Sequence, residues 1–139
     1  MQYRVGALEE ASRSLERAIR FLSDVGDRVG AAYLRAPLAD ILGLLGRSGE
    51  GSMLFREVEL DAREFGDRFL RAIALEGRGR LLFDRGDMAA SERDLRAALA
   101  EASSSRKASW EGSARAVLAL VLIRVGREDE GAELLGSAP

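Results

Sequence analysis

The stretch from Gly79 to Leu99, GRLLFDRGDMAASERDLRAAL, decides the fold because it contains two helical patterns joined at a glycine. Apolar residues recur at helical spacing on both sides of Gly86, which can adopt the left-handed conformation that closes a helix. Asp87 is a suitable N-cap for the second helix. The stretch therefore predicts two antiparallel helices joined by a tight turn.

The same pattern recurs every 40 residues, with glycines at Gly6, Gly46, Gly86 and Gly126. Five residues after each glycine stands a small residue: Ala11, Gly51, Ser91 and Gly131. Nine residues after each glycine stands a large apolar one: Leu15, Phe55, Leu95 and Leu135. We expect the small residue to let the two helices of a unit approach closely, and the large one to fill the gap between units.

One unit of this size cannot bury its own apolar face, so the units should stack. We predict a single domain over 1–139, with a partial unit at 1–26 and further units at about 27–66, 67–106 and 107–139. Met1 to Val5 would be the last turn of a helix that begins earlier. We therefore expect a fragment of a longer protein, or self-association through the first helix, whose apolar residues are Leu8, Leu15, Ile19 and Leu22.

Composition predicts an all-α protein and excludes several functions. Hydrophobic residues make up 47% of the chain and charged residues 32%, and strand-like alternation is missing. A net charge of −2 argues against a nucleic-acid binder, and no apolar run is long enough for a membrane span. The absence of cysteine fits a cytoplasmic location. We expect a soluble, cytoplasmic protein.

The chain lacks two residue types that enzymes commonly use for catalysis. It contains no histidine and no cysteine, so the commonest general base, thiol nucleophile and soft metal ligands are missing. Gly77 and Gly79 could suggest a phosphate loop, but they fall inside a predicted helix, where close helix packing is the better interpretation. We predict no catalytic activity, no metal and no cofactor.

The repeat resembles the tetratricopeptide family. The resemblance rests on Gly79, Gly86-Asp87, Leu95 and Ala98-Leu99, and extends over essentially the whole chain. The period of 40 exceeds the usual length of about 34 residues and is similar to long-helix variants in bacterial regulators and kinesin light chains. The family's early aromatic has no counterpart, because Arg35, Leu75 and Arg115 stand at that position. The resemblance implies a right-handed superhelix of about seven helices.

The resemblance also implies where a partner would bind. Such arrays usually hold a protein or peptide along the concave wall built from the first helix of each unit. The corresponding residues are Tyr33, Asp40, Glu76, Arg80, Phe83, Asp84, Leu120, Ile123 and Arg124. We expect a protein-interaction module within a larger bacterial regulatory or scaffold protein. The alternatives are a homodimer formed through the first helix, and a small-molecule sensor of the kind found in some bacterial transcription activators.

Four residues depart from the local pattern or need a separate interpretation. Arg78 stands where Leu38 and Leu118 stand, so it either extends its charge to solvent or is salt-bridged. Pro37 should kink its helix or start it late. Ser48 is a candidate N-cap after Gly46. Trp110 is expected to pack at the start of the last unit.

Overall fold

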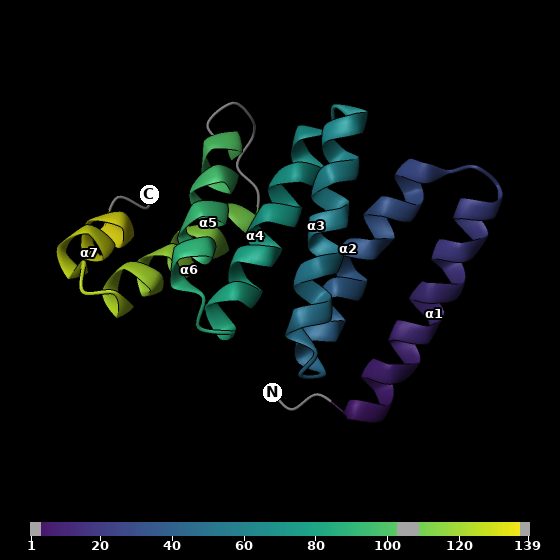
Figure 1. Cartoon of the computed structure of the whole chain (residues 1–139), viewed down its shortest axis with the longest axis horizontal. Helices are drawn as coiled ribbons and strands as arrows, with labels where there is room; N and C mark the ends of the chain where they lie inside the picture. Colours follow the sequence, from purple (N-terminus) through teal and green to yellow (C-terminus); the bar gives the residue numbers. More distant parts are fainter. Residues whose placement is uncertain (1–3, 103–108, 137–139) are drawn as a thin grey trace.

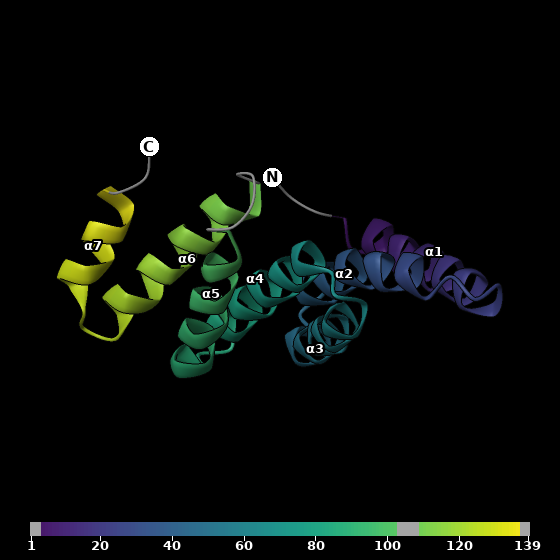
Figure 2. The same ribbon diagram turned by 90° about the horizontal axis from the view of Figure 1, so that it is seen from above.

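The computed structural model describes residues 4–102 and 109–136, and within them the chain forms seven α-helices and no strand. The prediction of an all-α fold is confirmed. Figures 1 and 2 show the helices in a row, with α1 and α7 at opposite ends. The helices are α1 (Val5–Asp24), α2 (Arg28–Leu44), α3 (Ser48–Phe65), α4 (Arg68–Asp84), α5 (Met88–Ala102), α6 (Ser109–Arg124) and α7 (Glu128–Gly136).

Glycines make the turns between helices wherever the structure describes the connecting residues. Five of them have φ between 71° and 88°, the left-handed region that glycine adopts without strain: Gly26, Gly46, Gly66, Gly86 and Gly126. Four of these turns are spaced 20 residues apart, which is half of the predicted repeat. An aspartate follows three of the glycines and caps the next helix. Its Oδ1 accepts from a backbone N–H at 2.8 Å for Asp27, 3.0 Å for Asp67 and 3.3 Å for Asp87, the last as predicted.

Two helix starts differ from the prediction. Gly6 lies inside the first turn of α1, and Arg4 before it has extended backbone, so no earlier helix ends at Gly6. The predicted last turn over Met1 to Val5 is therefore wrong for Arg4 and Val5, and the rest of it lies outside the described residues. Ser48 is the first residue of α3 and not its N-cap, because the turn after Gly46 places Arg47 at the cap.

Pro37 does not delay or interrupt its helix. α2 is continuous from Arg28 to Leu44, so the predicted late start is wrong, and the alternative of a kink at Pro37 stays a prediction. Pro37 is exposed, and its missing N–H removes only the hydrogen bond that would reach the carbonyl of Tyr33. Ala32 and Ala36 of the same helix are buried in a cluster with residues of other helices, and tertiary packing of this kind supplies most of the stability of a helix.

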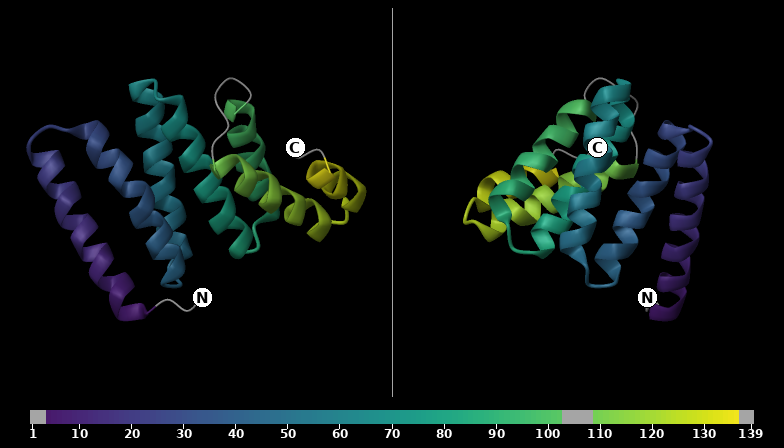
Figure 3. Two further views of the ribbon diagram at one scale, coloured as in Figure 1. Left: turned by 180° about the vertical axis from the view of Figure 1, so that it is seen from behind. Right: turned by 45° about the vertical axis from the view of Figure 1, so that its right-hand side comes forward.

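The seven helices pack in a regular order. Each helix contacts the next one in the chain, and α2 also contacts α4, as α4 contacts α6. Among the described residues the backbones of α1, α3, α5 and α7 make no such contacts with one another. The even-numbered helices therefore form a continuous row, while the odd-numbered helices are separated by grooves. Figure 3 shows α1 at the edge of this arrangement, with α2 beside it.

The predicted small residues bring the helices of each hairpin together. A Cβ added to Gly51 would lie 2.7 Å from the carbonyl oxygen of Ala39, closer than real contacts allow. Gly131 meets the Ala119 carbonyl in the same way, at 2.9 Å. In the middle hairpin the Ser91 hydroxyl instead donates to the Gly79 carbonyl at 2.7 Å. The expected role of the small position is confirmed at Gly51, Ser91 and Gly131, and it stays a prediction for Ala11.

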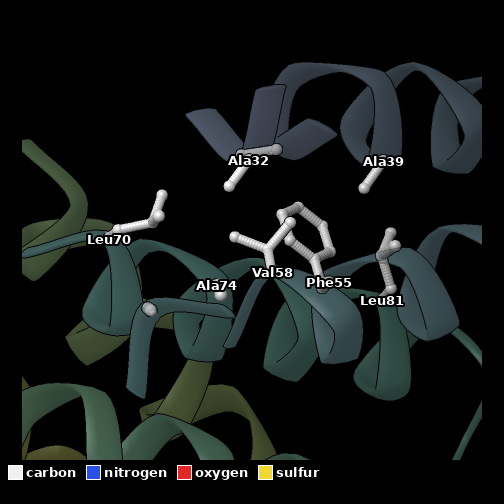
Figure 4. Close-up of a cluster of buried hydrophobic side chains, with 9 residues drawn as sticks. Ala32, Ala39, Phe55, Val58, Leu70, Ala74 and Leu81 are labelled. Atoms are coloured by element: carbon white, nitrogen blue, oxygen red, sulfur yellow. The ribbon is translucent and has the colours of Figure 1, made fainter. Parts of the chain in front are cut away.

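The large residues that follow fill the core, except at the end of the row. Phe55 and Leu95 are fully buried, whereas Leu135 is 50% exposed because no helix of the described chain follows α7. Figure 4 shows Phe55 and Val58 of α3 facing Ala32 and Ala39 of α2. The Phe55 ring also occupies the space beside Gly77, and Leu95 packs against Gly79. These contacts confirm the interpretation of the two glycines as close-packing positions.

Candidate partner-binding surface

The nine predicted binding residues all lie on α2, α4 and α6, the helices that contact one another. The structure divides them into three groups by their contacts. One group is an ion-pair cluster, one is a single tyrosine, and one consists of side chains near the C-terminal ends of α4 and α6. The three groups differ in their freedom to bind a partner.

The ion-pair cluster joins the three even-numbered helices. Arg80 of α4 donates from Nη2 to Oδ1 of Asp40 on α2 at 3.0 Å, and from Nε to Oε2 of Glu76 at 2.8 Å. The Ser113 hydroxyl of α6 donates to the same Glu76 oxygen at 3.1 Å. Glu76 is only 6% exposed. Three of the nine predicted residues, Asp40, Glu76 and Arg80, therefore lie together, and their contacts connect α2, α4 and α6.

The cluster changes the ionisation of its members. Burial acts to lower the pKa of Arg80, but hydrogen bonds and charges from Glu76 and Asp40 outweigh it and raise the pKa above its ordinary value. Partial burial raises the pKa of Asp40, and the Arg80 guanidinium offsets part of that increase. Arg80 therefore stays positively charged, and it already pairs with the carboxylates of Asp40 and Glu76.

Tyr33 contributes to the packing of α2 against α4. Its hydroxyl donates to Oδ2 of Asp67 at 2.6 Å. Burial and the charge and hydrogen bond of Asp67 together raise the pKa of Tyr33 to about 12. Because Asp67 also caps α4 through the N–H of Leu70, the hydrogen bond connects the middle of α2 to the start of α4.

The remaining residues leave apolar surface exposed. Leu120 is 50% exposed and Ile123 is 41% exposed, both on α6. The guanidinium of Arg124 lies 5.0 Å from the centre of the Phe83 ring, a cation–π contact between α6 and α4. Asp84, at the end of α4, is exposed. Of the nine predicted residues, this group is the most accessible to a partner.

Within the part of the chain that the structure describes, four surface hollows lie along the odd-numbered helices, and none of the nine residues lines these four. The largest, about 610 Å³, lies between α3 and α5 and has α4 as its floor. A second, of about 250 Å³, lies between α5 and α7 over α6. The other two, of about 410 and 590 Å³, adjoin α3 on the side of α1 and α2. All four are partly open to solvent.

The sequence interpretation missed the arginines of the largest hollow, which we call the α3–α5 groove. Arg56 and Arg93 line it from opposite walls. A signal existed for Arg93, since no acidic residue stands three or four positions away on its own helix. No such signal existed for Arg56, because Glu59 stands three residues later on the same helix. Only the structure shows that Glu59 pairs with Arg63 and Arg71 instead.

The described residues contain no cluster of His, Cys, Asp or Glu arranged to hold a metal. None of the described helices combines the length and apolar character of a membrane span. The side chain of Trp110 lies outside the part of the chain that the structure describes, so its predicted packing stays a prediction. No family model matches the chain, and no curated protein or solved structure is significantly similar to it.

Proposed function

We propose that the chain is a tetratricopeptide-like, right-handed superhelical array that binds a protein or peptide on the side built by α2, α4 and α6. The turns at glycines, the small residue at each hairpin and the row of contacting even-numbered helices support this assignment. The observation that carries the binding function is the exposure of Leu120 and Ile123 beside Arg124. Exposed apolar residues next to an arginine are typical of binding hot spots.

The test is capture of a partner by the immobilised domain, with a variant that alters only exposed side chains. The variant Leu120→Ser with Ile123→Ser keeps the ion-pair cluster intact, so it should fold as the wild type does. We expect it to bind the captured partner about tenfold more weakly or worse. Val5→Ser with Leu135→Ser is a matched control, because both are exposed apolar residues on odd-numbered helices, away from the proposed binding side. Equal capture by all three proteins would exclude a binding role for α6.

A second candidate function is homo-oligomerisation through α1. Phe21 is 65% exposed and Val25 is 62% exposed, which leaves two large apolar residues uncovered at the end of α1. Light scattering distinguishes this candidate from the first. A mass that rises with concentration in the wild type, and stays at one copy in Phe21→Ser with Val25→Ser, would support self-association. A strict monomer at all concentrations would remove it.

A further inference from the structure

The α3–α5 groove is a built surface, distinct from the even-numbered helices to which the proposed partner would bind. Its walls are α3 and α5, and Arg78 and Leu82 of α4 form part of its floor. It measures about 610 Å³, enough for a few side chains of a bound segment. Because α3 and α5 do not contact each other through their backbones, the groove arises from the packing order of the helices.

Most charges inside the groove are already paired. The Arg78 guanidinium donates to both carboxylate oxygens of Asp94, at 2.6 and 3.0 Å. Glu59 accepts from Arg63 and from Arg71, the latter at 3.1 Å. These pairs cancel the charges of the buried carboxylates, so the buried part of the groove neither attracts nor repels an ion strongly.

Two arginines at the rim have no such partner. Arg56 on α3 and Arg93 on α5 are exposed, and within the described residues neither takes part in a hydrogen bond, ion pair or ring contact. Among the described residues Arg13, Arg20 and Arg85 are unpaired as well, but they line none of the four hollows. Arg96 and Arg127, by contrast, each pair with two carboxylates. The groove therefore offers two free guanidinium groups from its two walls.

Apolar side chains stand next to these charges. Met53 is 68% exposed and Leu60 is 50% exposed. With Arg56 they occupy positions i, i+3 and i+7 of α3, which fall on one side of a helix. The same three residues also line the neighbouring hollow of about 590 Å³, where Leu42 and Leu54 add further apolar surface. An occupant can therefore bury apolar groups on both sides of this stripe.

We propose that the α3–α5 groove binds an acidic peptide segment whose carboxylates pair with Arg56 and Arg93 and whose apolar side chains pack on Met53 and Leu60. Unpaired guanidinium groups bind carboxylates through charge-assisted hydrogen bonds. Asp87 also lines the groove and would repel phosphates and peptide carboxylates alike, so its charge does not distinguish a nucleic acid from an acidic peptide. The exposed Met53 and Leu60 match side chains that a peptide has and a phosphate backbone lacks.

The probe is a fluorescein-labelled peptide composed of glutamate, leucine and phenylalanine, with binding measured by fluorescence anisotropy on the whole chain. A second peptide carries lysine in place of every glutamate. We expect the acidic peptide to bind and the basic peptide to bind at least about tenfold more weakly. The affinity for the acidic peptide should also fall as salt is added, because exposed ion pairs are screened.

Variants then locate the binding. Arg56→Glu with Arg93→Glu should weaken the acidic peptide about tenfold or more, and Met53→Ser with Leu60→Ser should also weaken it. Arg13→Glu with Arg20→Glu on α1 is the matched control, since it changes the net charge equally at two exposed arginines outside the groove. Circular dichroism verifies that each variant is folded.

Three outcomes would overturn the proposal. The first is that the acidic peptide does not bind. The second is that Arg13→Glu with Arg20→Glu weakens binding of the acidic peptide as much as Arg56→Glu with Arg93→Glu does. The third is that a single-stranded oligonucleotide binds more tightly than the peptide. The inference does not depend on the proposed partner of the even-numbered helices. Leu120→Ser with Ile123→Ser should leave acidic-peptide binding unchanged, so the two proposals can fail separately.

Discussion

Two hairpins of the molecule fill the same packing position with opposite chemistry. In the hairpin α2–α3, Leu38 and Leu54 pack in one apolar cluster. Forty residues later, in the hairpin α4–α5, the corresponding residues are Arg78 and Asp94, joined by hydrogen bonds of 2.6 and 3.0 Å. The hairpin α6–α7 returns to leucine at both positions, with Leu118 and Leu134 in one cluster.

The difference shows that this repeat position holds either an apolar pair or an ion pair, and we infer that the two members must match. Both members changed together, so neither charge is left alone inside the hairpin. The neighbouring seam follows the same rule, because Glu59 and Arg71 stand 40 residues after Ile19 and Ala31 and pair with each other. A buried ion pair adds little net stability, but removing one member is costly.

Replacing Asp94 alone should therefore have the largest effect. Asp94→Leu leaves the Arg78 guanidinium without its partner, with that side chain only 19% exposed. We expect the free energy of unfolding to fall by about 3 kcal/mol, measured by urea denaturation followed by circular dichroism. Arg93→Leu on the exposed side of the same helix should change it by less than about 0.5 kcal/mol. An equally stable Asp94→Leu would mean that the pair is not required in the hairpin.

Replacing both members should have a smaller effect. Arg78→Leu with Asp94→Leu recreates the leucine pair of the hairpins on either side. We expect a free energy of unfolding within about 1 kcal/mol of the wild type, or higher, because an apolar pair avoids the cost of burying two charges. With the single variant Arg78→Leu measured as well, the double-mutant cycle would then give a coupling of about 2 kcal/mol or more. If the double variant is as unstable as Asp94→Leu, the seam needs its charges, which would contradict the rule.

The helical repeat could be predicted from sequence because glycine spacing and small residues reflect local backbone constraints. Gly86 and Gly51 are examples, since a left-handed turn and a close helix contact each need a particular residue type. Partner choice among charged side chains could not be predicted. The hydrogen bond from Arg80 to Asp40 joins residues that are 40 positions apart. The sequence offers many other carboxylates with which each arginine could pair. Only the packing of α2 beside α4 selects this pair.

The smallest expected effect concerns Glu101 of α5, which connects the end of α5 to the start of α4 through Arg68 and Arg71. The hydrogen bond from Arg68, with help from Arg71, lowers the pKa of Glu101 below its ordinary value. A lowered pKa in the folded state stabilises the protein above the unfolded-state pKa, and that stabilisation is lost as the pH falls through the folded value. Glu101→Gln should therefore be less stable than the wild type at neutral pH, by less than about 1 kcal/mol.

The difference in the free energy of unfolding between Glu101→Gln and the wild type should shrink as the pH falls from about 5 to about 3, near the ordinary pKa of glutamate. Urea denaturation at a series of pH values measures it, and Asp24→Asn, an exposed carboxylate on α1, is the control for a general loss of charge. A pH-independent difference between Glu101→Gln and the wild type would assign the effect of Glu101 to its packing instead of its charge. In that case the charge of Glu101 would add no acid sensitivity to the stability of the hairpin α4–α5.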